Sequence, residues 1–141
     1  MAGTSVQSAH DFIKRKQAQF KRELDDEKPR CFKDIGRKGK HCWLREAWTF
    51  QAQHNLPEKV FVIERFRFHH KEGKRAHQTH PGDIEYRIGY WIVGKIGSTR
   101  GSWIWGQYSL LIPARDLGPL LRKAKRERTI RLGSALNRWK L

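Results

Sequence analysis

The sequence predicts an α+β domain in which an antiparallel sheet of three to four strands carries an N-terminal helix and a C-terminal helix on one of its faces. Two observations predict this fold. Aromatic and β-branched residues alternate in several runs between residues 43 and 112, which is typical of strands. Apolar residues recur at helical spacing in residues 8–24 and 116–127. At 141 residues the chain is long enough for a sizeable core, so we expect 1–141 to be a single domain.

The clearest element is a β-hairpin made by residues 84–95 and 103–111. Both runs are aromatic and β-branched, and the short loop between them is bounded by Gly97 and Gly101. Glycine supplies the positive φ angles that tight reversals need. In the second run neither face is polar, so which face is buried stays open. In the first run one face is expected against the core, and its members are Ile84, Tyr86, Ile88, Tyr90 and Ile92.

Two further runs before the hairpin are expected to be strands. Residues 59–70 are rich in β-branched and aromatic residues, and Arg65 and Arg67 are expected to be solvent-exposed on the open face of the sheet. Residues 43–53 fit a strand with one apolar face, and they also fit a helix. Two tryptophans and a Thr-Phe pair in this run favour the strand.

Helix signals occur near both ends of the chain. Ser8 with Asp11 three residues later is a capping-box pattern, which predicts a helix over 8–24. In the C-terminal helix Asp116 is the expected N-cap, which places Pro119 in the first turn, where proline is tolerated. The stripe expected to dock on the sheet consists of Leu117, Leu120, Leu121 and Ala124.

Residues 25–42 are expected to be a basic loop, and residues 1–7 and 132–141 to be frayed or loosely attached. Cys31 and Cys42 lie in this loop. With only two cysteines and no secretion signal, reduced thiols are favoured over a disulfide, although both stay open. No apolar run reaches the ~18 residues of a membrane span. We therefore expect a cytoplasmic protein, or a nuclear one in a eukaryote.

Charge gives the main functional signal. Lysine and arginine total 30 against 14 acidic residues, for a net charge of +16, and residues 86–141 contain only two acidic side chains. Self-repulsion on this scale opposes a compact fold, so a polyanionic partner is expected. Nucleic acid, DNA or RNA, is the favoured partner. We expect no membrane partner.

Tryptophans alternate with cations on the predicted hairpin. Trp91 shares its strand face with Arg87 and Lys95. Exposed rings beside cations would stack bases, worth ~1–3 kcal/mol each, while the cations contact phosphates. The alternative is that most of these rings belong to the core. The predicted nucleic-acid-binding residues are Arg65, Arg67, Arg87, Trp91, Lys95, Arg100, Trp103, Trp105, Arg122, Lys123, Lys125 and Arg126.

The sequence favours binding without catalysis. A metal-dependent nuclease using Glu64, Asp83 and His80 is the enzyme alternative, but no nuclease or nucleophile signature is present. His77 and His80 have a chelating spacing, yet a histidine-rich polar loop is often only solvated, so no metal and no cofactor are predicted. A third class is a protein-interaction module for an acidic partner.

The predicted strands 43–50, 60–68, 84–95 and 103–111, followed by a helix at 116–127, give the order ββββα. The last strand and helix entry read Trp105-Gly106-Gln107-Tyr108-Ser109-Leu110-Leu111-Ile112-Pro113, then Asp116-Leu117-Gly118-Pro119-Leu120-Leu121. In this order and segment the chain resembles the transcriptional-coactivator and Whirly class of single-stranded-DNA binders. The resemblance covers about half of the chain and gives the N-terminal helix no counterpart. It implies a homodimer built on the helices, with the sheets facing nucleic acid.

Overall fold

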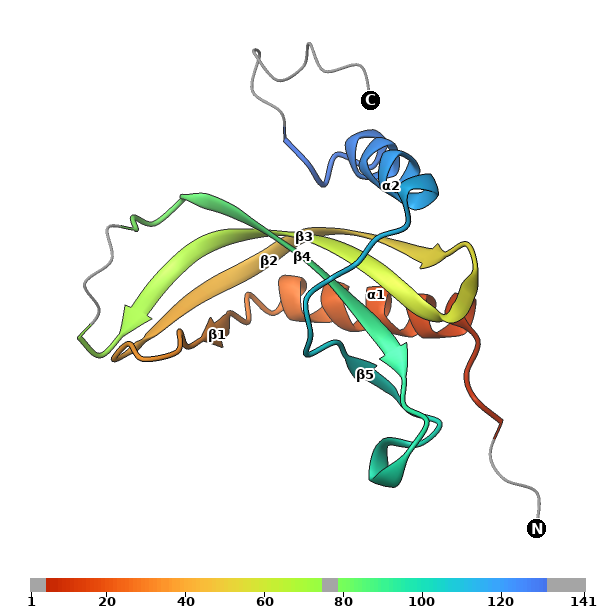
Figure 1. Ribbon diagram of the computed structural model, residues 1–141. Coiled ribbons are helices and arrows are strands. Elements are labelled where there is room, and N and C mark those ends of the chain that lie inside the picture. The colour runs from red at the N-terminus through yellow and green to blue at the C-terminus, as the bar shows by residue number, and fades with distance from the viewer. Residues whose placement is uncertain (1–4, 75–78, 132–141) are drawn as a thin grey trace.

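The sheet is a curled meander of antiparallel strands. The computed structural model describes residues 5–74 and 79–131. Within them, five strands lie in the order in which they follow along the chain (Figure 1). The predicted α+β class and antiparallel sheet are confirmed. The strands are β1 (Arg30–Phe32), β2 (Lys40–Gln53), β3 (Leu56–Glu72), β4 (Ile84–Val93) and β5 (Trp103–Trp105).

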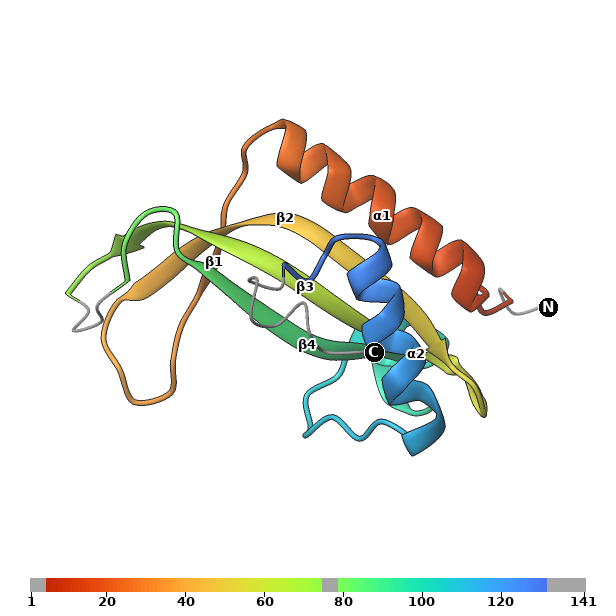
Figure 2. The ribbon, with the colours of Figure 1, turned by 90° about the horizontal axis from the view of Figure 1, so that it is seen from above.

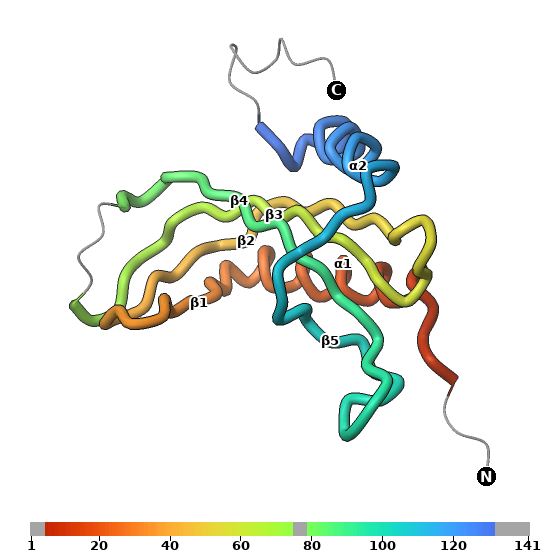
Figure 3. The backbone as a smooth tube through the Cα atoms, in the orientation of Figure 1, coloured from red at the N-terminus to blue at the C-terminus, as the bar shows by residue number. Residues whose placement is uncertain are grey.

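The strand count differs from the prediction at both edges of the sheet. β1 comes from the segment 25–42 that was expected to be a loop, and it pairs with β2. β5 is far shorter than the predicted run 103–111, because residues 106–113 leave the sheet edge and cross to the C-terminal helix (Figure 3). A register shift in β2 between Arg45 and Ala47 marks a bulge, and bulges increase the local bend and twist of a sheet.

The helices α1 (Ala9–Asp25) and α2 (Ala114–Arg126) pack on opposite faces of the sheet, so the prediction that both lie on one face is wrong (Figure 1). Seen from above, α1 runs alongside β2, and α2 crosses over the strands (Figure 2). Because side chains alternate along a strand, β3 directs Val60 and Val62 into the core beneath α1. It directs Phe61 and Ile63 into a second core beneath α2.

Helix α1 begins where its capping signal predicts. The Ser8 hydroxyl accepts a hydrogen bond from the Asp11 backbone N–H at 3.1 Å. Phe12 and Phe20, two turns apart, are both buried against the sheet. Burying a phenylalanine side chain contributes about 1.5–3 kcal/mol, so these two rings are the main anchors of the helix.

Helix α2 begins earlier than predicted, with Pro113 as the N-cap residue. Asp116 is therefore not the N-cap; its carboxylate instead accepts hydrogen bonds from the His54 backbone N–H at 3.2 Å and ring Nδ1 at 2.9 Å. Pro119 consequently lies in the second turn rather than the first. In the described part of the chain, no helix has the length and apolar character to cross a membrane.

Of the segments expected to be loosely attached, residues 1–4 and 132–141 lie outside the described residues, as does His77 of the predicted metal pair. Residue 7 is tied to the fold, because the Gln7 carbonyl accepts a hydrogen bond from Trp103 Nε1 at 2.8 Å. That bond joins the entry to α1 to the short edge strand β5.

Candidate functional site

A fully buried carboxylate lies on the α1 side of the sheet. Glu64, in the middle of β3, accepts a hydrogen bond from Arg45 Nε at 2.6 Å and two from Arg87, at 2.8 and 3.1 Å. Arg45 also donates to Glu23 of α1 at 2.8 Å. A buried carboxylate is costly unless it is paired and hydrogen-bonded. The two guanidinium groups satisfy the hydrogen bonds of Glu64, and Glu23 balances the second positive charge.

Aromatic rings contact the same two guanidinium groups. Arg45 Cζ lies 3.7 Å from the centre of the Phe20 ring. Arg87 Cζ lies 4.3 Å from the Trp105 ring and 4.9 Å from the Phe32 ring. Cation–π contacts of this kind are worth about 0.5–2 kcal/mol. Both arginines are therefore fixed in orientation by a carboxylate at their edge and rings at their faces.

A cavity of about 220 Å³ opens beside this cluster, between α1, β1 and the sheet. We call it the α1 cavity. Among the described residues that line it, four carry positive charge and none is acidic. The lining residues are Lys16, Gln19, Phe20, Arg30, Cys31, Phe32, Arg45, Arg87, Trp91 and Trp105.

Two of the four cations that line the α1 cavity, Lys16 and Arg30, are in an unfavourable electrostatic environment. The pKa of Lys16 lies below its usual value because of burial, and then because of the nearby charges of Arg15, Arg30 and Arg45. Burial, followed by the charges of Arg45 and Arg87, likewise lowers the pKa of Arg30. Lys16 Nζ also lies 4.1 Å from the centre of the Trp91 ring. An anion in this cavity would relieve the mutual repulsion.

One ring of the cavity carries a buried hydrogen-bond donor that has no partner among the described residues. The indole Nε1 of Trp91 is buried, and no described residue accepts its hydrogen bond. A buried polar group in this state costs about 1–3 kcal/mol. Trp91 is also one of the residues that line the α1 cavity.

A second hollow, of about 440 Å³, lies on the other side of the same helical turn. Arg15 and Lys16 are consecutive residues of α1, and each lines one of the two hollows. We call this one the Arg100 hollow. Its lining residues are Ser5, Gln7, Arg15, Arg100, Gly101, Ser102 and Trp103.

The structure brings part of the predicted binding set to these two hollows. Arg87, Trp91 and Trp105 line the α1 cavity, and Arg100 and Trp103 line the Arg100 hollow. The rings do not form the open platform that was expected. Helix α1 covers them, with the Phe12 ring stacked 4.5 Å from the Trp103 ring, and all three indoles are half-buried. Their contact with nucleic acid stays a prediction.

Other predicted residues lie elsewhere. Arg65 and Arg67 each donate to Glu46 at 2.8 Å on the opposite face of the sheet, and Arg65 is buried, so its predicted exposure is wrong. Lys95 pairs with Glu58. The cations of the C-terminal helix, on the α2 side, are Arg122, Lys123, Lys125 and Arg126. The predicted cationic residues are thus divided between both faces of the sheet.

The residues of the nuclease alternative do not converge. The backbone of Asp83 accepts a hydrogen bond from the N–H of Phe68 at 2.8 Å. Phe68 is four residues from Glu64 along β3, which corresponds to about 13 Å at the usual strand rise. Glu64 is sealed under two arginines, whereas His80, whose ring nitrogen lies 3.9 Å from the Asp83 carboxylate, is exposed in the loop before β4.

Sequence reasoning missed the contribution of β1 and α1. Arg30 and Phe32 flank Cys31 at alternate positions, so β1 directs both toward the cavity. Cys31 and Cys42 stand opposite each other in the register of β1 and β2 and form a disulfide, which corrects the expectation of reduced thiols. The alternation of Arg-Cys-Phe was the available signal, but it is only three residues long. Comparison of the chain with protein-family models, with curated proteins and with solved structures gave no match.

Proposed function

We propose that the protein binds single-stranded nucleic acid without catalysing a reaction, and that the α1 cavity receives one nucleotide of the strand. The observation that carries the proposal is the composition of this cavity. Four cations line it together with the rings of Phe20, Phe32, Trp91 and Trp105. Lysine and arginine contact phosphate, and flat rings stack on bases.

The size of the cavity supports a segment of a polymer over a complete small molecule. Pockets for whole cofactors and drug-sized ligands usually measure about 300–1,000 Å³. At about 220 Å³ the α1 cavity suits one planar or anionic group whose remainder lies outside. Bases in a duplex are stacked and paired, so only an unpaired strand presents such a group freely.

The Arg100 hollow gives the strand a path out of the cavity. Arg15 and Arg100 line this hollow, and Lys16 and Arg30 line the α1 cavity. Because Arg15 and Lys16 are neighbours in α1, the two sets of cations meet at one turn of the helix. We propose that phosphates follow Arg100, Arg15, Lys16 and Arg30 in this order.

Fluorescence anisotropy with labelled single-stranded oligonucleotides, titrated with salt, tests the proposal. We expect Lys16→Gln and Arg30→Gln each to weaken binding about tenfold and to reduce the slope of log K against log salt by about 0.7, the single-strand value for one phosphate contact. Arg126→Gln, an exposed cation of α2 on the other face, is the matched control and should leave the slope unchanged.

Three results would contradict the proposal. The first is the absence of binding at low salt. The second is stronger binding to duplex than to single strands of equal length. In the third, Arg126→Gln weakens binding and Lys16→Gln does not, which would place the nucleic acid on the α2 side. Competition with polyglutamate tests the acidic-protein alternative. If the site is built for acidic peptides, polyglutamate should displace the labelled oligonucleotide from it.

A further inference from the structure

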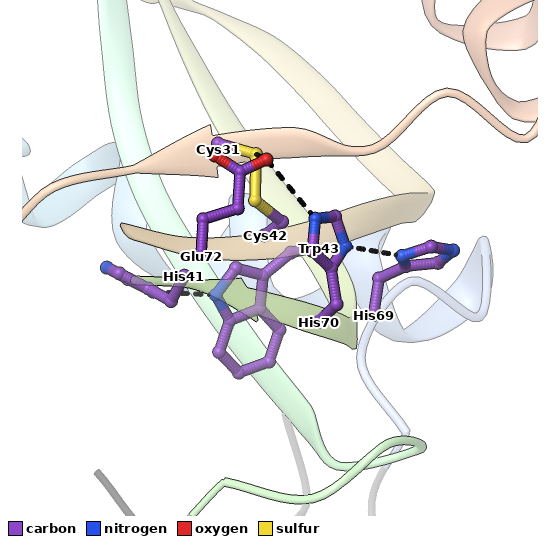
Figure 4. Close-up of a disulfide and its surroundings, with 7 residues drawn as sticks. All are labelled: Cys31, His41, Cys42, Trp43, His69, His70 and Glu72. Carbon is purple, nitrogen blue, oxygen red and sulfur yellow. Dashed lines mark hydrogen bonds and ion pairs between the residues drawn. A yellow bond between two sulfur atoms is a disulfide. The ribbon is translucent and has the colours of Figure 1, made fainter. Parts of the chain in front are cut away.

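A group of potential metal ligands lies where three neighbouring strands meet, and it shares Cys31 with the lining of the α1 cavity (Figure 4). Cys31 of β1 stands opposite Cys42 of β2, and Cys42 stands opposite His70 of β3. Glu72 follows His70 by two residues, so both side chains leave the same side of β3. One ligand atom from each of the four residues lies within 4.8 Å of all the others.

We propose that the protein binds one Zn²⁺ ion through Cys31, Cys42, His70 and Glu72 when its disulfide is reduced. Zinc binds sulfur at about 2.3 Å and nitrogen or oxygen at about 2.0–2.2 Å in a tetrahedron. The ligand atoms of such a site are therefore about 3.3–3.8 Å apart. The largest separation here is 4.8 Å, about 1 Å more than a tetrahedral site allows. Reduction of the disulfide also frees the two sulfur atoms to move apart to about 3.8 Å, so rotations of the four side chains complete the tetrahedron.

The ligand types select zinc. Two thiolates and an imidazole favour Zn²⁺ over Mg²⁺ or Ca²⁺, which prefer oxygen ligands alone. Cys42 is fully buried, whereas Cys31 and Glu72 are exposed. The site consequently has a closed inner side and an open outer side through which an ion enters.

The orientation of His70 is already that of a zinc ligand. Its Nε2 lies 3.3 Å from a carboxylate oxygen of Glu72, and its Nδ1 lies 2.7 Å from Nδ1 of His69 (Figure 4). If Nε2 of His70 binds the metal, Nδ1 carries the proton and donates a hydrogen bond to Nδ1 of His69. Hydrogen bonds from the outer ring nitrogen are the usual means of fixing a metal-binding histidine.

The redox step exchanges one cross-link for another. A dithiol reductant gives two electrons and two protons to the Cys31–Cys42 disulfide, producing two thiols and the disulfide of the reductant. Zn²⁺ then binds both sulfurs and displaces their two protons. A disulfide oxidant reverses the sequence by taking two electrons from the thiolates and releasing the ion. Under reducing conditions the zinc site fastens β1 to β2 and also to β3.

The experiment uses the full-length protein, reduced with a dithiol that is then removed by gel filtration under nitrogen. We expect the reduced protein to bind one equivalent of Zn²⁺. With Co²⁺ as a spectroscopic probe it should show a sulfur-to-cobalt charge-transfer band and the visible bands of tetrahedral cobalt. The oxidised protein should show neither. A reduced protein without the charge-transfer band would overturn the proposal.

Variants that keep both cysteines test the other two ligands. We expect His70→Gln and Glu72→Gln each to lower zinc affinity at least ~10-fold, and His69→Ala, which removes only the orienting partner, to lower it about 10-fold. His80→Gln is the matched control, because His80 is an exposed histidine outside the cluster. Equal affinity in His70→Gln and the parent protein would overturn the four-ligand site. The circular dichroism of each oxidised variant shows that it is folded before reduction.

Discussion

Glu64 and Arg87 face each other across β3 and β4, and two hydrogen bonds, 2.8 and 3.1 Å long, join the carboxylate to the guanidinium. Arg45 contacts the same carboxylate from β2. One buried acid thus fixes two cations from neighbouring strands. Both arginines line the α1 cavity, so the carboxylate supports both the fold and the proposed binding site.

Replacing Glu64 by Gln should strongly destabilise the protein. The change preserves the side-chain volume but removes the carboxylate charge that pairs with Arg87 and leaves Arg45 with Glu23 alone. Breaking a buried ion pair in this way costs about 3–5 kcal/mol. Urea unfolding followed by circular dichroism measures the loss. Glu58→Gln removes the exposed partner of Lys95 and should cost less than about 1 kcal/mol. Similar losses in the two variants would contradict the role given to Glu64.

Two glycine substitutions should act in opposite directions. A Cβ atom at Gly89 would overlap the indole of Trp105, so Gly89→Ala should cost about 1–3 kcal/mol through overpacking. At Gly118, in α2, the nearest atom to an added Cβ is the flexible end of Arg122, at 3.1 Å. Gly118→Ala should therefore gain up to about 1 kcal/mol from helix propensity. Thermal unfolding compares the variants, and a stable Gly89→Ala protein would show that β4 and β5 are not packed this closely.

Asp116 should contribute a pH-dependent part of the stability. Burial acts to raise its pKa, but hydrogen bonds from the side chain and backbone of His54, and then the charge of His54, outweigh burial and hold the pKa below its ordinary value of 3.8. Because the folded pKa is the lower one, the stabilisation is complete above about pH 4 and is lost as the pH falls through the folded pKa.

The comparison of Asp116→Asn with the parent protein isolates this effect. We expect a difference in unfolding free energy of about 1–2 kcal/mol at pH 7, the usual worth of hydrogen bonds to a charged group. The difference should shrink below pH 4, and urea unfolding at a series of pH values follows it. A difference independent of pH would mean that the Asp116 charge does not stabilise the fold.

Reduction of the Cys31–Cys42 disulfide in the presence of a chelator should destabilise the protein by about 2–4 kcal/mol. The disulfide closes a short loop between residues separated by 11 positions, and its main effect is to restrict the unfolded chain. Urea unfolding with and without a dithiol measures the change. The double variant Cys31→Ser, Cys42→Ser should behave like the reduced protein. An unchanged unfolding midpoint would contradict the expectation.

Alternation and capping were sufficient to predict α1 and the long strands β2, β3 and β4, but not the short strands at the two edges of the sheet. Ser8 begins α1 as its pattern indicates, and β3 follows the predicted alternation. In β2 the bulge between Arg45 and Ala47 shifts the alternation, so Arg45 lies on the same side of the sheet as Phe50. The placement of the helices could also have been predicted from β3. Val60, Phe61, Val62 and Ile63 form a continuous apolar run, and a strand that is apolar on both faces needs cover on both.

The details of the candidate site depend on contacts between residues far apart in the sequence. Arg65 was expected to be exposed to solvent because it occupies the polar side of a strand. Instead it is buried and donates a hydrogen bond to Glu46, which is 19 residues away in the sequence. Arg30 enters the α1 cavity only because β1 pairs with β2. Local sequence patterns carry no information on such pairings, so the charge of the site could be predicted and its geometry could not.

The two walls of the α1 cavity are joined by a very short link. Phe20 belongs to α1 and Arg30 to β1, and only residues 26–29 connect these elements. Four extended residues span at most about 14 Å. This short link limits how far the two walls can separate, so the side chains that line the cavity are preorganised before a ligand binds. Little conformational freedom is then lost on association, and most of the contact energy contributes to affinity.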